Sequence, residues 1–402
     1  MRIKQFKLYY NIFIASEKKW QLPKKAQILI YDSINKEILK PYLKKYTQAT
    51  LALRGEFINI PCLILATLKW SFWKGNVLNA YIDSYIERVE PIVVITLVDN
   101  NKRFYSISKR FPKLKTIFLQ NGLRTKSGDI FGSLSKSDNY HVDYMLVTSE
   151  AIGKYYLNFL SGQYNVVGTL SNNAVIRPTN IKATDILFIS QLNNNIKDDN
   201  TFFIKDDGTS ISSNTFFSTE IKVLKLLAKW CFENNKQLKI CGREKINNNN
   251  EKYFYINYLK GSKCVWEYIP RKSCYSSYNL IDKAHIVISI GSTLGYEAIA
   301  RGKRTAFFSC RGDDLGDTSY RFGWPLKLPD SGPIWTNKQD DLGFQLPKIM
   351  NYLNAISDDE WTKVCQNYKN LVMEFDQGNT YFVKLLDQLL SENRNQTYNS
   401  TI

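Results

Sequence analysis

Short apolar runs rich in β-branched residues alternate with longer amphipathic stretches along most of the chain, and no other feature of the sequence constrains the fold as strongly. Unbroken apolar runs are typical of strands covered on both faces, as in a parallel sheet with helices on either side. The pattern indicates the α/β class. In the first half it predicts strands at 27–32, 92–98, 115–119 and 143–148, and helices at 33–46, 75–89, 102–111 and 149–160.

The same alternation resumes near residue 185. It predicts strands at 185–191, 237–241, 264–268, 285–290 and 304–309, and helices at 216–235, 251–260, 275–283 and 293–301. A polar segment rich in Asn and Asp follows the first of these strands and runs through residue 215. Because that segment has little hydrophobic periodicity, we expect a long functional loop there.

At 402 residues the chain is longer than one hydrophobic core usually supports, so two domains with a cleft between them are expected. We place a first Rossmann-like domain at 1–175 and a second at 176–356. A C-terminal helical segment with a polar tail is expected at 357–402.

The chain carries 54 Lys and Arg against 37 Asp and Glu, a net charge of +17. Such an excess favours acidic partners, among them nucleotides, anionic sugars and an anionic lipid surface, although it is equally typical of a solvated surface. The basic residues are spread along the chain and no aromatic-basic RNA motif occurs, so nucleic acid is not an expected partner.

Seven cysteines without a Cys-x-x-Cys pair indicate a reducing compartment, and the N-terminus lacks the apolar core of a secretory signal. The longest strongly apolar stretch, 57–68, is too short to cross a bilayer. We therefore expect a cytoplasmic protein, with the inner membrane as a peripheral contact.

The strongest local signal for a binding site is the predicted strand 285–290 that leads through a Gly-Ser-Thr turn into a helix. A helix N-terminus offers free amide groups and a positive dipole end, and Gly291 lets a phosphate approach the backbone. The hydroxyls of Ser292 and Thr293 can donate, and Glu297 lies one helical turn further, where it could accept from ribose hydroxyls. The alternative is a strand followed by a capped helix without a ligand.

Other polar groups also follow predicted strands, and ligands of parallel sheets collect at the carboxyl ends of the strands. Gln120, Asn121 and Arg124 follow one strand, and Arg243 follows another. The amides suit hydroxyl groups, and the guanidinium groups suit phosphate or carboxylate. Turns with exposed charges are the alternative at both places.

Two adjacent carboxylates, Asp206 and Asp207, stand in the polar loop and could supply a nucleophile or a general base, although solvated loop residues are the alternative. Only two histidines occur, with no cluster of metal-ligand spacing and no isolated Asp-x-Asp. We therefore expect metal-independent chemistry without a cofactor.

Five segments, in order, resemble the bacterial surface carbohydrate biosynthesis proteins over roughly residues 90–325. They are Ile-Thr-Leu-Val-Asp-Asn-Asn101, Phe-Leu-Gln-Asn-Gly-Leu-Arg124, Ile-Leu-Phe-Ile-Ser-Gln191, Leu-Lys-Ile-Cys-Gly-Arg243 and Ser-Ile-Gly-Ser-Thr-Leu-Gly-Tyr-Glu-Ala-Ile-Ala-Arg-Gly-Lys303. The resemblance implies a GT-B glycosyltransferase, in which two Rossmann-like domains, the first for the acceptor and the second for the nucleotide-sugar donor, face a central cleft.

The arrangement also resembles retaining β-Kdo transferase modules, which use CMP-Kdo to extend O-antigen and capsule chains. By that resemblance, Ser289 to Thr293 hold the donor phosphate, Glu297 holds the ribose and Asp207 is the nucleophile. The spacing from Gln191 to Asp207 is longer than in the capsule-linker relatives, and Gly242-Arg243 stands where many CMP-sugar enzymes carry His-Pro.

The expected activity is therefore retaining transfer of Kdo from CMP-Kdo to a lipid-linked or oligosaccharide acceptor, for lipopolysaccharide or capsule. Asp206 or Glu150 would deprotonate the acceptor. The donor site would comprise Gln120, Asn121, Gln191, Arg243, Ser289, Gly291, Ser292, Thr293 and Glu297. Two alternatives remain open: a transferase that uses another nucleotide sugar or a teichoic-type polyol-phosphate donor, and a non-enzymatic sugar- or nucleotide-binding assembly protein.

Overall fold

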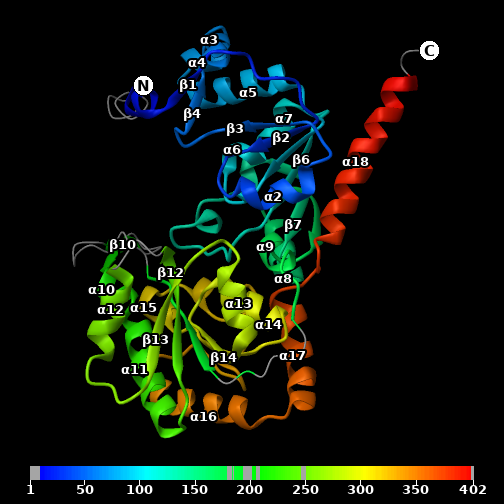
Figure 1. The fold of residues 1–402 in the computed structure, drawn as a ribbon. Coiled ribbons are helices and arrows are strands. Elements are labelled where there is room, and N and C mark those ends of the chain that lie inside the picture. The colour runs from blue at the N-terminus through cyan, green and yellow to red at the C-terminus, as the bar shows by residue number, and fades with distance from the viewer. Residues whose placement is uncertain are drawn as a thin grey trace.

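Two six-stranded parallel sheets, one in each half of the chain, form the framework of the computed structural model (Figure 1). The structure describes residues 10–178, 183, 185–192, 202–204, 209–245 and 250–399. The sheets confirm the predicted α/β class. The chain passes from the first sheet to the second between Val166 and Asp185.

The first sheet has the strand order β3-β2-β5-β6-β7-β8, and every neighbouring pair is parallel. Its strands are β2 (Ile28–Tyr31), β3 (Gln48–Leu51), β5 (Val93–Thr96), β6 (Lys115–Leu119), β7 (Tyr140–Val147) and β8 (Leu160–Val166). Its helices are α2 (Lys36–Leu43), α5 (Val77–Val89), α6 (Lys102–Tyr105), α7 (Ile107–Arg110), α8 (Glu150–Tyr156) and α9 (Leu170–Asn173).

The predicted interior strands of this sheet are confirmed to within a few residues, because their side chains are buried on both faces. Two edge strands, β3 and β8, were not predicted, since half-exposed side chains leave no apolar run. The predicted helix at 149–160 is too long, because α8 ends at Tyr156 and the chain enters β8 at Leu160. The predicted helix at 102–111 is broken at Ser106 into α6 and α7.

A small layer at the far end of the first half combines a two-stranded parallel sheet with two short helices (Figure 1). Its elements are β1 (Glu17–Lys19), β4 (Phe57–Asn59), α3 (Ile60–Thr67) and α4 (Trp70–Trp73). Asn59 caps α3 by accepting a hydrogen bond from the amide of Cys62, and Pro61 occupies the first turn, where no amide donor is needed.

The second sheet has the order β13-β12-β9-β14-β15-β16, again parallel throughout. Its strands are β9 (Asp185–Ile189), β12 (Leu238–Lys245), β13 (Trp266–Arg271), β14 (Ala284–Ser289), β15 (Arg304–Phe308) and β16 (Trp335–Thr336). Its helices are α11 (Ser218–Glu233), α12 (Asn250–Leu259), α13 (Ser276–Lys283), α14 (Thr293–Ala300), α15 (Arg311–Leu315), α16 (Leu342–Ala355) and α17 (Asp358–Val372).

The polar segment predicted as one long loop contains regular structure, which corrects that prediction. Residues of β10 (Phe202–Ile204) and β11 (Ser210–Ser212) pair as an antiparallel hairpin, and α10 (Ser213–Phe216) follows directly. Ser212 starts α10 by accepting from the amide of Thr215, which is why Ser and Thr here belong to a helix cap and not to a loop.

The last helix, α18 (Thr380–Asn399), returns to the first half and runs along its side (Figure 1). Its apolar face buries Phe382, Leu386 and Leu390 against Ile30 and Leu39 of the first half. The amide of Asn379, just before the helix, donates to the hydroxyl of Tyr42 at 2.6 Å. The C-terminal segment is therefore divided, with α17 on the second half and α18 on the first.

Replacing Leu386, which is 1% exposed, tests this return of the chain. We expect Leu386→Ala to lower the free energy of unfolding by about 2–5 kcal/mol, because a cavity is left between α18 and the first sheet. Urea denaturation measures the change. The matched control is Leu371→Ala in α17, where the leucine is 42% exposed and the expected loss is much smaller. Equal losses in the two variants would contradict the packing of α18.

Candidate functional site

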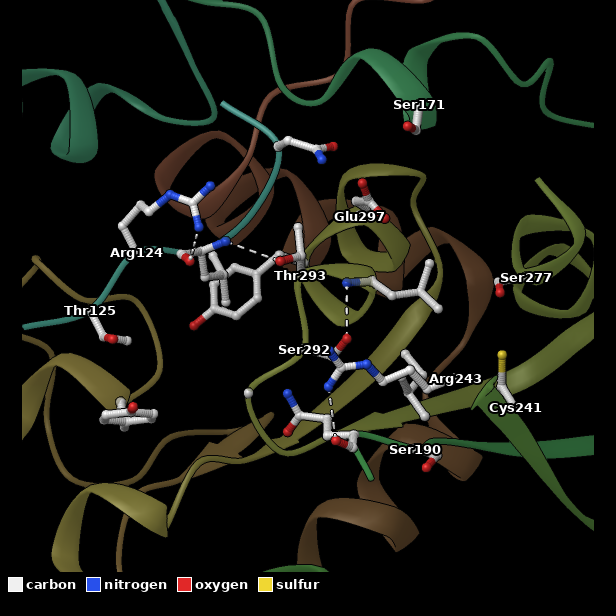
Figure 2. A pocket seen from close by; sticks show the side chains of 18 of the residues that line it. Arg124, Thr125, Ser171, Ser190, Cys241, Arg243, Ser277, Ser292, Thr293 and Glu297 are labelled. Carbon is white, nitrogen blue, oxygen red and sulfur yellow. Dashed lines mark hydrogen bonds between the residues drawn. The ribbon is translucent and has the colours of Figure 1, made fainter. Parts of the chain in front are cut away.

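A cavity of about 590 Å³ lies between the two halves (Figure 2). This volume is within the range of small-molecule sites, and the cavity is situated where the strands of both parallel sheets end. The first half contributes, among others, Asn121, Leu123 and Ser171 to its lining. The second half contributes groups that follow β9, β12 and β14, which include Gln191, Arg243 and Gly291 to Thr293.

The turn from β14 into α14 is built by residues behind the cavity wall. Ser289 is fully buried, and its hydroxyl accepts from the amide of Ser292 at 3.2 Å. Gly295 packs against Ser289 so closely that a Cβ at position 295 would lie 2.3 Å from the serine side chain. Ser289 therefore shapes the turn and does not line the cavity.

The cavity side of the same turn presents Gly291, Ser292 and Thr293. Ser292 caps α14, because its hydroxyl oxygen accepts from the amide of Leu294 at 3.3 Å. The hydroxyl oxygen of Thr293 accepts from the amide of Leu123 in the other half at 3.0 Å. Because both hydroxyls act as acceptors in these bonds, their own protons are left to donate to an anion.

Glu297 lies one turn further along α14, lines the cavity and is 6% exposed. Its carboxylate accepts a hydrogen bond from the hydroxyl of Thr169 in the first half. Burial raises the pKa of Glu297 from its ordinary value to about 7, although hydrogen bonds from Thr169 and Tyr278 act in the opposite direction. The side chain can therefore be neutral or charged near neutral pH.

Five arginines and one carboxylate, that of Glu297, are among the described residues that line the cavity. Arg311 is neutralised by the buried Glu220, and Arg321 contacts Asp330 at 2.9 Å. Arg243 donates to the backbone oxygen of Gln191 and Arg271 to that of Ser273. Within the described part of the chain neither forms an ion pair with a carboxylate, although Arg271 is near enough to Glu297 to lower the pKa of that carboxyl. Both guanidinium groups can therefore bind an anionic ligand.

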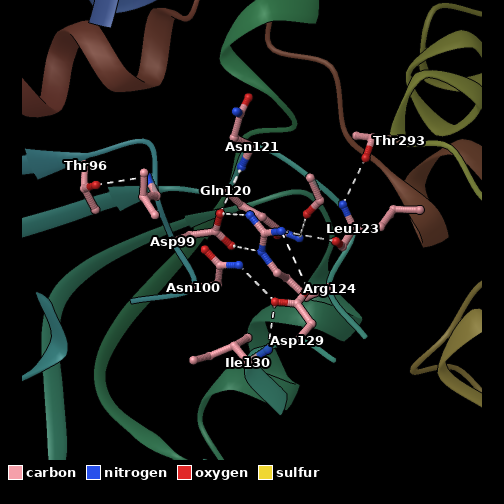
Figure 3. Close-up of polar contacts among 12 residues, drawn as sticks. Thr96, Asp99, Asn100, Gln120, Asn121, Leu123, Arg124, Asp129, Ile130 and Thr293 are labelled. Carbon is pink, nitrogen blue, oxygen red and sulfur yellow. Dashed lines mark hydrogen bonds and ion pairs between the residues drawn. The ribbon is translucent and has the colours of Figure 1, made fainter. Parts of the chain in front are cut away.

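The fifth arginine, Arg124, belongs to a buried network that supports the loop after β6 (Figure 3). Its Nε donates to Oδ2 of Asp99 at 2.7 Å, and Tyr156 donates to the same oxygen at 2.9 Å. Asp99 keeps Arg124 protonated and raises its pKa against the effect of burial. The carboxylate also accepts from the amide of Asn121 at 3.3 Å, so this ion pair positions the loop on which Asn121 faces the cavity.

The side chain of Gln120 likewise forms its hydrogen bonds within the protein. Its side-chain nitrogen donates to the oxygen of Gly122 at 2.8 Å, and its side-chain oxygen accepts from the amide of Thr148 at 3.0 Å. It is 1% exposed and does not line the cavity. Its amide therefore holds β6 and β7 together at their carboxyl ends, where hydroxyl recognition had been expected.

Two polar atoms of cavity-lining residues are buried without a hydrogen-bond partner in the described part of the structure: Oε1 of Gln191 and Nε of Arg321. An unpaired buried polar atom costs about 1–3 kcal/mol. The oxygen of Gln191 lies 3.8 Å from where a Cβ on Gly291 would stand, so it faces the turn from β14 into α14. A ligand with a donor group would satisfy it.

The structure thus brings seven of the predicted donor-site residues to one cavity: Asn121, Gln191, Arg243, Gly291, Ser292, Thr293 and Glu297. Gln120 and Ser289 lie directly behind it. Glu150 lies elsewhere, half-exposed and bonded to Tyr164 and Lys154. Asp206 and Asp207 lie outside the described residues.

Two further residues of the cavity lining, Arg271 and Tyr278, were not predicted as site residues. The rule that ligands collect at strand ends would have identified Arg271, but the strand was predicted to end at residue 268 and β13 continues to Arg271 itself. Tyr278, on α13, carries no local signal. In the described ranges, no three His, Cys, Asp or Glu side chains gather into a group that could hold a metal ion.

A family model described as "putative O-antigen biosynthesis protein" matches residues 117–390. A search of curated proteins found no match. Among solved structures, a "putative UDP-N-acetylglucosamine 2-epimerase" from Listeria monocytogenes is 10% identical, with a TM-score of 0.53, over 92% of this chain and 97% of the other. The UDP-GlcNAc 2-epimerase of Methanocaldococcus jannaschii is 10% identical, with a TM-score of 0.50, over 93% and 99%. At this identity the likeness concerns the fold, and it confirms the predicted GT-B arrangement of two Rossmann-like halves.

The raised pKa of Glu297 predicts a pH-dependent stability. Between about pH 4.5 and pH 7 the folded protein keeps a proton on Glu297 that the unfolded chain has lost, so stability falls as the pH rises through this window, by about 3 kcal/mol in total. We expect Glu297→Gln to remove this fall. Urea denaturation at a series of pH values measures it, and the exposed Glu267→Gln is the control. An unchanged pH profile in Glu297→Gln would show that the carboxyl titrates normally.

Proposed function

The chain belongs to this family of O-antigen biosynthesis proteins, and we propose that it is a glycosyltransferase whose central cavity binds a nucleotide sugar. The observation that carries the proposal is the set of anion-binding groups that converge on the cavity. The hydroxyls of Ser292 and Thr293 at the start of α14 face the same space as the unpaired guanidinium groups of Arg243 and Arg271.

Each of these groups suits the phosphate of a nucleotide. A helix N-terminus carries partial positive charge, and hydroxyl and guanidinium donors form short, strong bonds to phosphate oxygens. Glu297, which lines the same cavity, would in its charged form accept from ribose hydroxyls. The oxygen of Gln191 supplies one further acceptor, for a sugar hydroxyl or a base amino group.

The donor that we propose in particular is CMP-Kdo. This molecule carries two acidic groups close together, the phosphate of CMP and the carboxylate of the sugar. Arg243 and Arg271, which form no ion pair with a carboxylate, can each bind one of these two anions. A guanidinium group can bind a phosphate or a carboxylate through two parallel hydrogen bonds. Arg243 thereby replaces the His-Pro pair that many CMP-sugar enzymes of this fold carry.

For the chemistry, we propose retention through Asp207. Its carboxylate attacks the anomeric carbon, the bond to the CMP phosphate breaks, and CMP leaves with that electron pair. An acceptor hydroxyl then attacks the same carbon, gives its proton to a base and restores the carboxylate. Glu150 is not suited as that base, because it lies away from the cavity. Asp206 remains the candidate.

The acceptor that we propose is a lipid-linked glycan that enters between the halves. A peripheral contact with the anionic inner leaflet would bring the enzyme to it, and the basic excess of the chain supports such a contact.

Donor binding is predicted to depend on the two unpaired arginines. Loss of one charged hydrogen-bond donor to phosphate costs about 1.5–3 kcal/mol, so Arg243→Ala or Arg271→Ala should weaken nucleotide binding by about 10- to 100-fold. A thermal-shift titration with CMP, UDP, GDP and CDP measures affinity and identifies the nucleotide. Lys272→Ala, next to Arg271 but outside the cavity lining, should bind as the wild type does. Equal effects of all three variants would indicate only a change of net charge.

Turnover is predicted to require Asp207. Wild-type protein should release CMP from CMP-Kdo in the presence of a suitable acceptor, and Asp207→Asn should lower the rate by about a thousandfold or more while nucleotide binding persists. Intact mass spectrometry of the wild type with donor alone should show a glycosyl adduct that is absent in Asp207→Asn.

The outcomes separate the alternatives. Phosphorus in the glycan product would indicate a polyol-phosphate transferase. Binding of a nucleotide sugar without turnover of any donor would indicate an assembly protein. No CMP-Kdo turnover, together with turnover of another nucleotide sugar, would overturn the choice of donor and retain the glycosyltransferase.

A further inference from the structure

Exposed apolar side chains are concentrated at one place on the molecule. Of the 17 large hydrophobic residues that are exposed in the described structure, nine fall within residues 10–73. Single exposed apolar residues are normal, but a contiguous group of them marks an interaction site. The nine are Tyr10, Phe13, Ile14, Trp20, Leu22, Ile64, Leu68, Trp70 and Trp73.

Three of them, Tyr10, Phe13 and Trp73, line an apolar groove of about 720 Å³ in the small layer at the end of the first half. Leu78 also lines the groove, together with Phe57 and Phe72. The indole nitrogen of Trp73 donates to the backbone oxygen of Thr67 at 2.7 Å, which fixes the ring beside α3. Leu68 and Trp70, which follow α3, are 79% and 73% exposed, and Figure 1 shows α3 and α4 at the end of the first half remote from the second half. We name the surface that is made of the nine exposed residues and this groove the aromatic face.

Basic side chains border the aromatic face. Residues 10–30 and 54–75 contain seven Lys and Arg against two Glu. Three of the seven, Lys25, Arg54 and Lys69, form ion pairs with carboxylates outside these ranges, which leaves four lysines on the border. The ammonium group of Lys74 lies 5.5 Å from the ring centre of Trp70, and that of Lys19 lies 3.5 Å from that of Phe57. Tryptophan rings bordered by lysines are typical of surfaces that sit at the boundary between lipid headgroups and acyl chains.

We propose that the aromatic face docks on an anionic lipid bilayer, with its tryptophan and leucine side chains inserted among the headgroups and its lysines on the lipid phosphates. The inference rests on the proposed function only because a lipid-linked acceptor would give the enzyme a reason to be at the membrane. Membrane docking itself does not require the donor site. Charge argues against a second copy of the chain as the occupant, because a symmetric pairing would bring two basic borders together.

The geometry fits a contact that does not cross the membrane. At eight residues, α3 is about 12 Å long, well short of the hydrocarbon core. No helix within the described ranges has the length and the apolar character that a bilayer crossing needs. Docking at this end leaves the central cavity away from the bilayer surface and open to substrates.

Vesicle binding tests the inference. The full chain should co-sediment with vesicles of equal parts phosphatidylglycerol and phosphatidylcholine, and weakly or not at all with phosphatidylcholine alone. Trp70→Ser combined with Trp73→Ser should reduce the affinity by about tenfold or more. Lys24→Gln and Lys74→Gln should each reduce it about fivefold, and added salt should reduce it further.

A matched aromatic-lysine pair on the second half provides the control. Phe344 is 69% exposed and Lys348 lies 5.9 Å from its ring, so Phe344→Ser with Lys348→Gln removes the same chemistry outside the aromatic face. This control should bind vesicles as the wild type does. The inference is overturned if the wild type does not bind anionic vesicles, or if the control and the test variants lose the same amount of vesicle affinity. It is also overturned if size-exclusion chromatography shows a dimer that the tryptophan variants abolish. Thermal shift with nucleotide, unchanged in every variant, shows separately that the fold and the donor site persist.

Discussion

The helix α14 is held by both halves of the molecule, and the shape of the site depends on this double attachment. At its start, Thr293 accepts from Leu123 of the first half, and midway Glu297 accepts from Thr169. After its last turn, the fully buried Arg301 pairs with Asp282 at 2.6 Å and donates to the backbone oxygen of Val175 at 3.0 Å. A buried guanidinium is costly unless all its donors are bonded, so these partners fix the end of the helix, and with it the position of the turn from β14 into α14.

Much of the fold could be predicted because interior strands of parallel sheets are apolar on both faces. The runs at 92–98 and 285–290 are continuous, and the structure has β5 and β14 there. The edge strand β8 lacks that signal, since its exposed Ser161 and Gln163 resemble a loop. The return of α18 to the first half could not be predicted, because an amphipathic helix shows that it packs but not against which sheet.

The site was predicted less completely, for a reason that lies in strand geometry. The rule of strand ends placed Gln191 and Arg243 correctly at the cavity, but neighbouring residues at a strand end point in opposite directions. Asn121 therefore faces the cavity while its neighbour Gln120 bonds the protein behind it. In the turn after β14, Gly291 lines the cavity while Ser289 supports the turn through a hydrogen bond from the amide of Ser292. Residue type alone does not separate a side chain that binds a ligand from one that shapes the loop.

The chain has a net charge of +17, and two regions of the described structure carry basic side chains of chemically different kinds. Within the cavity the positive groups are arginines, whose planar guanidinium groups are weakly hydrated and match phosphate and carboxylate oxygens in fixed geometry. Around the aromatic face lysines predominate, and their strongly hydrated ammonium groups on flexible stems suit a fluid layer of headgroups. Because the two regions lie at opposite ends of the first half, the proposed donor recognition and the proposed membrane contact can be tested independently of each other.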